Sequence, residues 1–452
     1  MKKQLTIEEK LQNALVPKEE QPYKIPSNWC WSYWKYCGKF IAGNGFKNIY
    51  QGFTQYDIPY YKVGSLKFCD EGNYLIDETN TINEEIRTKL KAVKIPVNSI
   101  IFAKIGEAIK LNRRCLNKIE CCIDNNLMAF ISEKYFYKYI FYWTKSLNFY
   151  ELTNATTVPA LRKTDLENIP IPLPPLNEQQ RIVNIIESLF AKLDRAKELI
   201  ENTLAQFEQN KMAILHKAFT GELTAKWRKE NNIDLSSWKE KTIDELCTSL
   251  KYGTSKKSKP EGSVVVLRMG NLQNGEIDWS NLMYTDDKDD IEKYLLKKGD
   301  VLFNRTNSPE LVGKTSIYRG EYPAIYAGYL IKLDYGKDII GEYLNYMMNS
   351  TKAKHYCYTV KTDGVSQSNI NAKKIGAFEI PVPTIEEQQE IVNILDKLLA
   401  KYNKIKNLEQ QLEKIELLKK AILAKAFRGE LGTNNPDEES AENLLKEILA
   451  EK

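Results

Sequence analysis

The chain has 452 residues, with 65 Lys and Arg against 60 Asp and Glu and a formal net charge of +5. Hydrophobic residues make up 42% and charged residues 28%, which excludes a chain disordered throughout and supplies more than one hydrophobic core. The charge balance is too even to indicate nucleic-acid binding by itself, so basic charge has to be local to matter.

Membrane, secreted and metal-dependent classes are also disfavoured by the sequence. The apolar runs are too short to span a bilayer, and the first twenty residues lack the apolar stretch of a secretory signal, so we expect a cytoplasmic protein with no membrane contact. Eight Cys without a C-x-x-C pair argue against a disulfide framework and a paired-thiolate zinc site. With only His216 and His355, chemistry that uses several imidazoles is unexpected, and no metal site is predicted.

In chain order, a short N-terminal helical arm is predicted over residues 1–22 and a first mixed α+β domain over 23–168. Within this domain, runs rich in Tyr, Phe, Val and Ile between Gly, Asn and Pro predict strands, such as 99–105. Residues 131–146 predict an amphipathic helix instead. A long spacer helix region is then predicted over 169–225.

A second α+β domain is predicted over 226–379, with an amphipathic helix over 337–356. It is followed by a second spacer helix region over 380–432 and a tail helix over 433–452. Thr384 with Glu387 predicts a capping box at the start of the second spacer helix, and Gly429 predicts its end. A helix of about 40 residues would be about 60 Å long.

Apolar residues recur at steps of three and four along both spacer regions, the pattern of a helix with one buried stripe. Such long stripes are buried most simply if the two helices pack against each other as an antiparallel pair. The predicted interhelix seam consists of Ile182, Ile186, Leu189, Leu193, Ile391, Leu395, Leu398, Leu412 and Ile415. A long helical hairpin inside an ordinary core is the alternative.

The sequence also repeats itself. IPIPLPPLNEQQ at 169–180 matches FEIPVPTIEEQQ at 378–389, and HKAFTGEL at 216–223 matches AKAFRGEL at 424–431. A fainter repeat upstream matches Trp31 with Trp238. The predicted fold class is therefore α+β, with two pseudo-repeated α+β domains separated by two long antiparallel coiled-coil helices.

Basic loops with interleaved aromatic and small polar residues recur in both α+β domains. Lys and Arg supply phosphate contacts, while Arg, Asn, Gln and Ser supply contacts to base edges. The candidate DNA-binding residues are Asn44, Lys47, Lys104, Lys110, Arg113, Arg114, Arg162, Lys251, Tyr252, Thr254, Lys256, Lys257, Arg305, Thr306, Lys314, Lys361, Ser366 and Gln367. A lysine-rich loop that is merely solvated is the alternative for each stretch.

Motifs for catalysis are incomplete. Val312–Thr315 resembles the end of a phosphate-binding P-loop, but Ser308 stands where that loop needs its first Gly. The acidic residues Asp286, Asp287, Asp289 and Asp290 lack the spacing of a cation loop and predict a solvated, mutually repelling segment. Neither a dinucleotide-binding glycine motif nor the Asn-Pro-Pro-aromatic tetrapeptide of amino-methyltransferases is present, so no catalytic residue is predicted.

Two variable domains, each followed by an I-P-[IV]-P…E-Q-Q…A-F-[TR]-G-E-L helix, resemble the specificity (S) subunit of type I restriction–modification systems. The resemblance implies two target recognition domains, each reading one half of a bipartite, asymmetric site in double-stranded DNA. It implies that the helices set the spacing and dock two methylation (M) subunits, with two restriction (R) subunits in the full complex. It further implies that this chain is not an enzyme and binds no cofactor, while partner subunits bring S-adenosylmethionine, ATP and Mg.

Two other functions stay open from the residues alone. The chain could be a coiled-coil scaffold that binds proteins, in which case DNA would not compete for its variable domains. It could also be a self-contained DNA-modifying enzyme, although cofactor motifs are missing.

Overall fold

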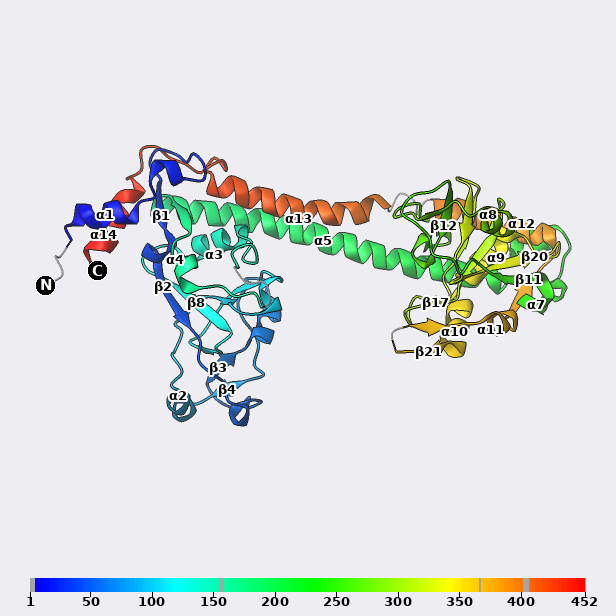
Figure 1. The fold of residues 1–452 in the computed structure, drawn as a ribbon, viewed down its shortest axis with the longest axis horizontal. Coiled ribbons are helices and arrows are strands. Elements are labelled where there is room, and N and C mark those ends of the chain that lie inside the picture. The colour runs from blue at the N-terminus through cyan, green and yellow to red at the C-terminus, as the bar shows by residue number, and fades with distance from the viewer. Residues whose placement is uncertain (1–4, 154–157, 366, 401–405, 452) are drawn as a thin grey trace. The chain divides into compact units, whose positions relative to one another are not determined.

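A computed structural model describes residues 5–153, 158–365, 367–400 and 406–451. The chain divides into two compact units, Met1–Glu198 with Gln411–Lys452 (unit 1) and Leu199–Gln410 (unit 2). Helix α5 (Leu176–Phe219) contributes its first half to unit 1 and its second half to unit 2. Each unit therefore combines one α+β domain with segments of the long helices (Figure 1).

The two ends of the chain meet in unit 1, where α1 (Ile7–Ala14) lies beside α14 (Ala441–Ala450) (Figure 1). Thr6 and Glu9 form a capping box that starts α1, and the Ser440 side chain accepts a hydrogen bond from Glu442 N at the start of α14. The Lys10 ammonium donates to Leu449 O at 3.1 Å. The C-terminal segment is thus part of the same folded unit as the N-terminal arm.

Unit 1 contains an antiparallel sheet, a small mixed sheet and a two-stranded ribbon. The antiparallel sheet has the order β2 (Gly38–Ala42), β8 (Leu127–Ser132), β5 (Ile100–Ala103) and β6 (Arg114–Leu116). The mixed sheet has the order β4 (Thr81–Ile82), β3 (Ile58–Tyr61) and β7 (Cys122–Ile123), and the ribbon pairs β1 (Cys30–Tyr33) with β9 (Pro170–Leu173). Its helices are α2 (Glu84–Leu90), α3 (Tyr137–Ser146) and α4 (Lys163–Glu167).

The core of unit 1 is aromatic. The Trp34 side chain is fully buried, and its ring centroid lies 5.0 Å from both Phe130 on β8 and Trp143 on α3. Such aromatic contacts add to the burial of apolar area that holds α3 against the sheet.

Unit 2 repeats the strand order of unit 1. Its antiparallel sheet runs β11 (Cys247–Tyr252), β20 (Leu330–Tyr335), β16 (Val301–Asn304) and β18 (Thr315–Ile317). Its mixed sheet runs β15 (Tyr284–Thr285), β12 (Val264–Leu267) and β19 (Ala324–Tyr326), and its ribbon pairs β10 (Lys239–Thr242) with β23 (Glu379–Val382). In each unit the only parallel pair among these sheets lies in the mixed sheet, β3–β7 and β12–β19. The predicted repeat of two α+β domains is confirmed.

Unit 2 has additional short elements. They are the hairpin β13 (Leu272–Gln273) and β14 (Glu276–Ile277), the sheet β17 (Thr306–Asn307), β22 (Ser368–Asn369) and β21 (Thr362–Asp363), and the helices α6 (Ala225–Glu230), α7 (Ile243–Leu246), α8 (Lys288–Tyr294), α9 (Gly341–Met348), α10 (Thr351–Val360) and α11 (Ala372–Gly376). The 3-10 turns of the chain are η1 (Lys18–Glu20), η2 (Trp34–Tyr36), η3 (Asn48–Tyr50), η4 (Val63–Lys67), η5 (Glu107–Ile109), η6 (Leu235–Ser237) and η7 (Met269–Asn271).

Two predicted helices have different bounds. The segment 131–146 begins as the end of strand β8, turns at Lys134, whose φ of 59° is left-handed, and becomes helical only as α3. The segment 337–356 is divided into α9 and α10 because Ser350 caps a new helix by accepting a hydrogen bond from Ala353 N at 3.3 Å. The predicted strand at 99–105 is present as β5.

The second spacer region is described as α12 (Ile385–Ala400) and α13 (Lys406–Phe427), and residues 401–405 lie outside the described part. In unit 1, Ile182 and Ile186 of α5 share one core with Leu423 and Phe427 near the end of α13. The first turns of α5 therefore meet the last turns of α13, which is an antiparallel arrangement.

In unit 2, Ile391 and Leu395 of α12 share one core with Leu215 and Ala218 near the end of α5. Here the first turns of α12 meet the last turns of α5, again antiparallel. Among the other predicted seam residues, Ile415 is buried, while those that are half-buried are Leu189, Leu193, Leu398 and Leu412.

Candidate nucleic-acid interface

The loops that leave β5 and β16 occupy equivalent places in the two units. In unit 1 Lys104 O accepts a hydrogen bond from Leu161 N at 2.8 Å, and in unit 2 Arg305 O accepts one from Ile370 N at 2.9 Å. Lys104 and Arg305 are therefore equivalent residues. Each brings the loop after a central strand beside the loop that precedes the unit's last short helix.

A second equivalent pair lies at the end of the first sheet strand. Gly43 and Gly253 pack so closely against the neighbouring strand that a Cβ would lie 2.0 Å and 2.1 Å from its nearest carbonyl oxygen. Only glycine fits this approach. The residues that follow, Asn44 and Thr254, are thereby held in the same position of the two units.

In unit 2 the structure gathers three predicted residues around Asn369. The Arg305 guanidinium donates to Asn369 Oδ1 at 3.1 Å and lies 4.9 Å from the Tyr252 ring centroid. Asn369 in turn donates to Thr306 Oγ1 at 2.8 Å. Tyr252, Arg305 and Thr306 thus form one polar cluster, in which the amide of Asn369 has a fixed orientation. Asn369 was missed because an isolated Asn in a loop carries no spacing signal.

Several predicted basic residues lie in ion pairs within the protein. Lys110 pairs with Glu107 at 2.7 Å, Lys251 with Asp334 at 3.1 Å, and Lys361 with Asp363 at 2.6 Å. The hydrogen bond from Lys361 lowers the pKa of the Asp363 carboxyl below its usual value. These lysines have a carboxylate partner within the chain.

Other predicted cations have no ion pair among the described residues: Lys47, Lys104, Arg113, Arg162, Lys257 and Lys314. Lys47, Arg113, Arg162 and Lys257 are exposed, whereas Lys104 and Lys314 are half-buried. Gln367 is exposed, and Asn44 is half-buried and accepts a hydrogen bond from Val93 N at 3.2 Å. Ser366 lies outside the described residues.

The prediction for Arg114 requires correction. Its side chain is buried, donates to Asn112 O and to Leu147 O at 2.8 Å, and stacks 3.8 Å from the Phe149 ring centroid. Burial lowers the pKa of Arg114 to about 9, which leaves it charged at neutral pH. Because its donors point into the fold, Arg114 is a core residue and does not face a DNA strand.

Thr254 and Lys256 also have internal roles. Thr254 is buried and its hydroxyl donates to the Asp290 carboxylate, while Lys256 pairs with Asp287 at 2.7 Å. Asp287 additionally caps α8 by accepting a hydrogen bond from Asp290 N. The acidic residues that were predicted to repel one another are thus partly neutralised. Because Thr254 is buried, it is not an accessible candidate for DNA binding.

We expect Arg114→Ala to lower the free energy of unfolding by about 2 kcal/mol, because two backbone carbonyls lose their charged donor. Urea unfolding followed by circular dichroism measures this change. Arg113→Ala is the matched control, since Arg113 is exposed and adjacent. Equal stability of the two variants would contradict the core position of Arg114.

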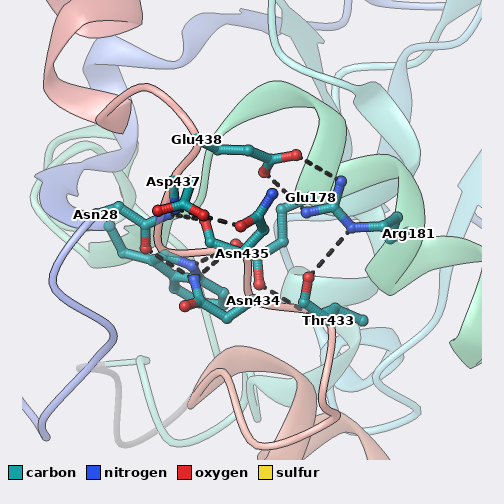
Figure 2. A network of polar contacts seen from close by, with 9 residues as sticks. Asn28, Glu178, Arg181, Thr433, Asn434, Asn435, Asp437 and Glu438 are labelled. Carbon is teal, nitrogen blue, oxygen red and sulfur yellow. Dashed lines mark hydrogen bonds and ion pairs between the residues drawn. The ribbon is translucent and has the colours of Figure 1, made fainter.

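The repeated E-Q-Q motif lies in a buried polar cluster, which we name the Glu socket. In unit 1 it contains Glu178, Trp29, Thr433 and Asn434 (Figure 2). Glu178 is fully buried and accepts hydrogen bonds from Trp29 Nε1 at 2.8 Å, Thr433 Oγ1 at 3.0 Å and Asn434 Nδ2 at 3.0 Å. The socket therefore holds the segment after α13 against the start of α5.

Figure 2 also shows how the surrounding residues extend this attachment. Arg181 forms a bidentate pair with Glu438 at 2.7 and 2.8 Å and donates to Thr433 O at 3.1 Å. Asn28 donates to Asn435 O at 2.9 Å. A bidentate arginine pair fixes geometry as well as charge. The segment 433–438 is consequently anchored both from the residues just before β1 and from α5.

In unit 2 the Glu socket contains Glu387, Trp238, Thr224 and Arg228. Glu387 is fully buried and accepts from Thr224 Oγ1 and Arg228 Nη1, both at 2.6 Å, and from Trp238 Nε1 at 2.9 Å. Thr384 Oγ1 accepts a hydrogen bond from Glu387 N at 3.3 Å, as the predicted capping box requires. The Glu387 carboxylate instead binds the socket, so the reciprocal half of that prediction is wrong.

The two Glu sockets also correct the predicted match of Trp31 with Trp238. Trp29, rather than Trp31, is equivalent to Trp238, because each precedes the first strand of its ribbon and donates to the socket glutamate. The next residue of the motif has a repeated role as well. Gln179 accepts from Phe136 N at 3.1 Å and Gln388 from Ile340 N at 2.9 Å, at the residues that cap α3 and α9.

No group of three or more His, Cys, Asp or Glu side chains among the described residues could hold a metal ion. Over the same part of the chain, no helix combines the length and apolarity needed to cross a membrane.

Comparison with known proteins places this architecture in a family. The family described as "Type I restriction modification DNA specificity domain" matches residues 48–206 and 236–417. The type I restriction enzyme EcoKI specificity subunit of Escherichia coli (strain K12) is 30% identical over 317 residues, covering 67% of this chain and 68% of that protein. The StySPI specificity subunit of Salmonella potsdam is 29% identical over 335 residues, covering 70% and 71%.

A solved structure shares this fold. A solved structure concerned with complex assembly and conformational transition of the type I R-M system covers 91% of this chain and 100% of its own, with a TM-score of 0.65 and 19% identity. The two family matches cover most of the two α+β domains and much of the adjoining helices. The chain therefore belongs to the type I restriction–modification DNA specificity family, in which its role is non-catalytic recognition of DNA.

Proposed function

We propose that the α+β domains of units 1 and 2 each read one half of a bipartite, asymmetric site in double-stranded DNA. The observation that carries the proposal is the pair of equivalent loops beginning at Lys104 and Arg305, set on the same strand order but with different side chains. Equivalent positions favour the same kind of contact, while different side chains favour different bases.

In this proposal the helices α5, α12 and α13 fix the spacing between the half-sites and dock two methylation subunits, and two restriction subunits join the full complex. The partners would bring S-adenosylmethionine, ATP and Mg, and methylation of a base within the duplex requires it to be flipped out of the stack. To read DNA in this way, this chain would need none of these cofactors. The complex would act in the cytoplasm, where cellular DNA is accessible.

The test is methylome sequencing of cells that express the full chain with its methylation subunits. We expect a methylated motif with two specified halves, which is abolished when this chain is deleted. Asn369→Ala, which frees Arg305 and Thr306, should relax one half only. A change in both halves, or methylation that persists without this chain, would contradict the assignment.

A second expected result concerns salt. Affinity of the reconstituted complex for its duplex should fall steeply with salt concentration, with a slope of about −0.9 per phosphate contact. Lys257→Gln should make the slope shallower by about one contact, because Lys257 is exposed and has no ion pair among the described residues. Lys251→Gln is the control, since Lys251 is paired with Asp334 at 3.1 Å. Fluorescence anisotropy over a salt series measures both slopes.

A further inference from the structure

Unit 2 contains a cavity on which three lysines converge. It has a volume of about 340 Å³ and lies between α5, the loop that joins β17 to β18, and α10. Lys211 comes from α5, Lys314 from the loop and Lys354 from α10. The volume is within the range of small-molecule pockets.

The charges of Lys211 and Lys314 both act on the Lys354 ammonium group. Desolvation first, and then the charges of Lys211 and Lys314, lower the pKa of Lys354, while Glu208 acts in the opposite direction. Burial likewise lowers the pKa of Lys314. At Lys354, therefore, the Glu208 carboxylate does not outweigh burial and the two lysine charges, because a sufficient opposing charge would raise the pKa.

The cavity is lined by three lysines against two glutamates. Within the described part of the chain none of the three lysines has a salt bridge, and the Lys314 ammonium donates to the neutral Gln273 Oε1 at 2.8 Å. Glu208 and Glu310 also line the cavity, and both are exposed. An anion bound between the lysines would relieve their mutual repulsion.

The wall that bears Lys314 is held in place. Gly313 has a left-handed φ of 95°, and a Cβ on it would lie 2.8 Å from Cys357 Sγ of α10, so loop and helix are in close contact. Asn304 pairs with this turn, accepting from Gly313 N at 2.9 Å and donating its own N–H to Lys314 O at 2.8 Å. A preorganised wall reduces the entropy that binding would cost.

The rest of the lining is apolar or aromatic, with Met212, Leu311, Met348 and Tyr358 among its residues. Tyr358 is 66% exposed and Leu311 43% exposed. A ligand that fits the cavity has an anionic group that contacts the lysines and a compact organic group that contacts the apolar and aromatic lining. Lysine ammonium groups bind phosphate as point charges.

We propose that the lysine cavity of unit 2 binds the phosphoryl group of a phosphate ester. The phosphoryl oxygens lie between Lys211, Lys314 and Lys354, and the organic group contacts Tyr358 and Leu311. A free nucleotide and the backbone of a DNA strand both carry this group, and neither source depends on the domain reading a base sequence.

The experiment uses the full chain and adenosine monophosphate carrying an N-methylanthraniloyl fluorophore, with inorganic phosphate as competitor. Lys354→Gln should weaken nucleotide binding about tenfold, the effect of losing one charged contact. Glu208→Gln should strengthen it, because the opposing carboxylate charge is removed. Lys352→Gln is the matched control: Lys352 lies on the same helix, but it pairs with Glu240 at 3.2 Å and does not line the cavity.

A second arm measures the salt slope for duplex DNA with the same variants in complex with the methylation subunits. If nucleotide binding is weaker in Lys354→Gln, stronger in Glu208→Gln and unchanged in Lys352→Gln, the site binds a free phosphate ester. No nucleotide binding, with a shallower DNA slope in Lys354→Gln but not in Lys352→Gln, assigns it to the DNA backbone. If Lys354→Gln and Lys352→Gln behave alike in both arms, the proposal is wrong, whether or not the methylome supports a bipartite site.

Discussion

Glu387→Ala is expected to lower the free energy of unfolding of unit 2 by about 4 kcal/mol. The substitution leaves the buried Arg228 guanidinium without its carboxylate and removes the acceptor of Thr224 and Trp238. Breaking a buried ion pair by removing one partner is among the costliest single substitutions, because the remaining charge stays desolvated.

Glu386→Ala is the control, because Glu386 has the same chemistry one position earlier on α12 but is exposed. We expect a change within about 0.5 kcal/mol for this variant. Urea unfolding gives both values, and hydrogen exchange assigns the loss to unit 2. A Glu387 variant as stable as the Glu386 variant would remove the Glu socket from the interactions that stabilise the unit.

Glu178→Ala is expected to cost about 3 kcal/mol in unit 1, because three buried donors lose their acceptor at once. Those donors are neutral, so the expected loss is smaller than at Glu387. The effect should also be local. Amides from Thr433 through α14 should exchange faster, since Thr433 and Asn434 attach that segment to α5.

Glu201→Ala is the control for this second change, because Glu201 lies on the same helix and is exposed. Hydrogen exchange with mass spectrometry resolves the C-terminal segment from the rest of unit 1. Uniformly faster exchange across the unit would instead mean that Glu178 supports its core in general, and unchanged exchange after Thr433 would show that Arg181 with Glu438 is a sufficient attachment.

The architecture could be predicted from the sequence because the residues that hold each unit together belong to the repeat. Residues that hold the frame, such as Glu178 and Glu387, recur in both halves with their neighbours, and helical periodicity located α5, α12 and α13. The hydrogen-bond partners of those glutamates could not be predicted from the sequence. Arg228 lies 159 residues from Glu387, and only the folded chain brings them together.

The candidate interface was predictable as loops but not as individual side chains. Arg113 and Arg114 are adjacent in the sequence, yet one is exposed and the other is buried because Arg114 begins strand β6 and its side chain reaches Leu147 O. Composition identifies a basic segment, whereas strand direction decides which face each residue takes. The charge of Lys256 was overestimated as free because its partner Asp287 lies 31 residues away in the sequence and is brought near only by the fold.

The hydrogen bonds that hold the frame of each unit do not depend on its basic loops. Tyr139 and Tyr343 each donate to a proline carbonyl of the following strand at 2.7 Å, and Gln179 and Gln388 accept backbone N–H groups. None of these contacts uses a side chain from the basic loops. Substitutions of those loop side chains therefore leave these contacts of the frame unchanged.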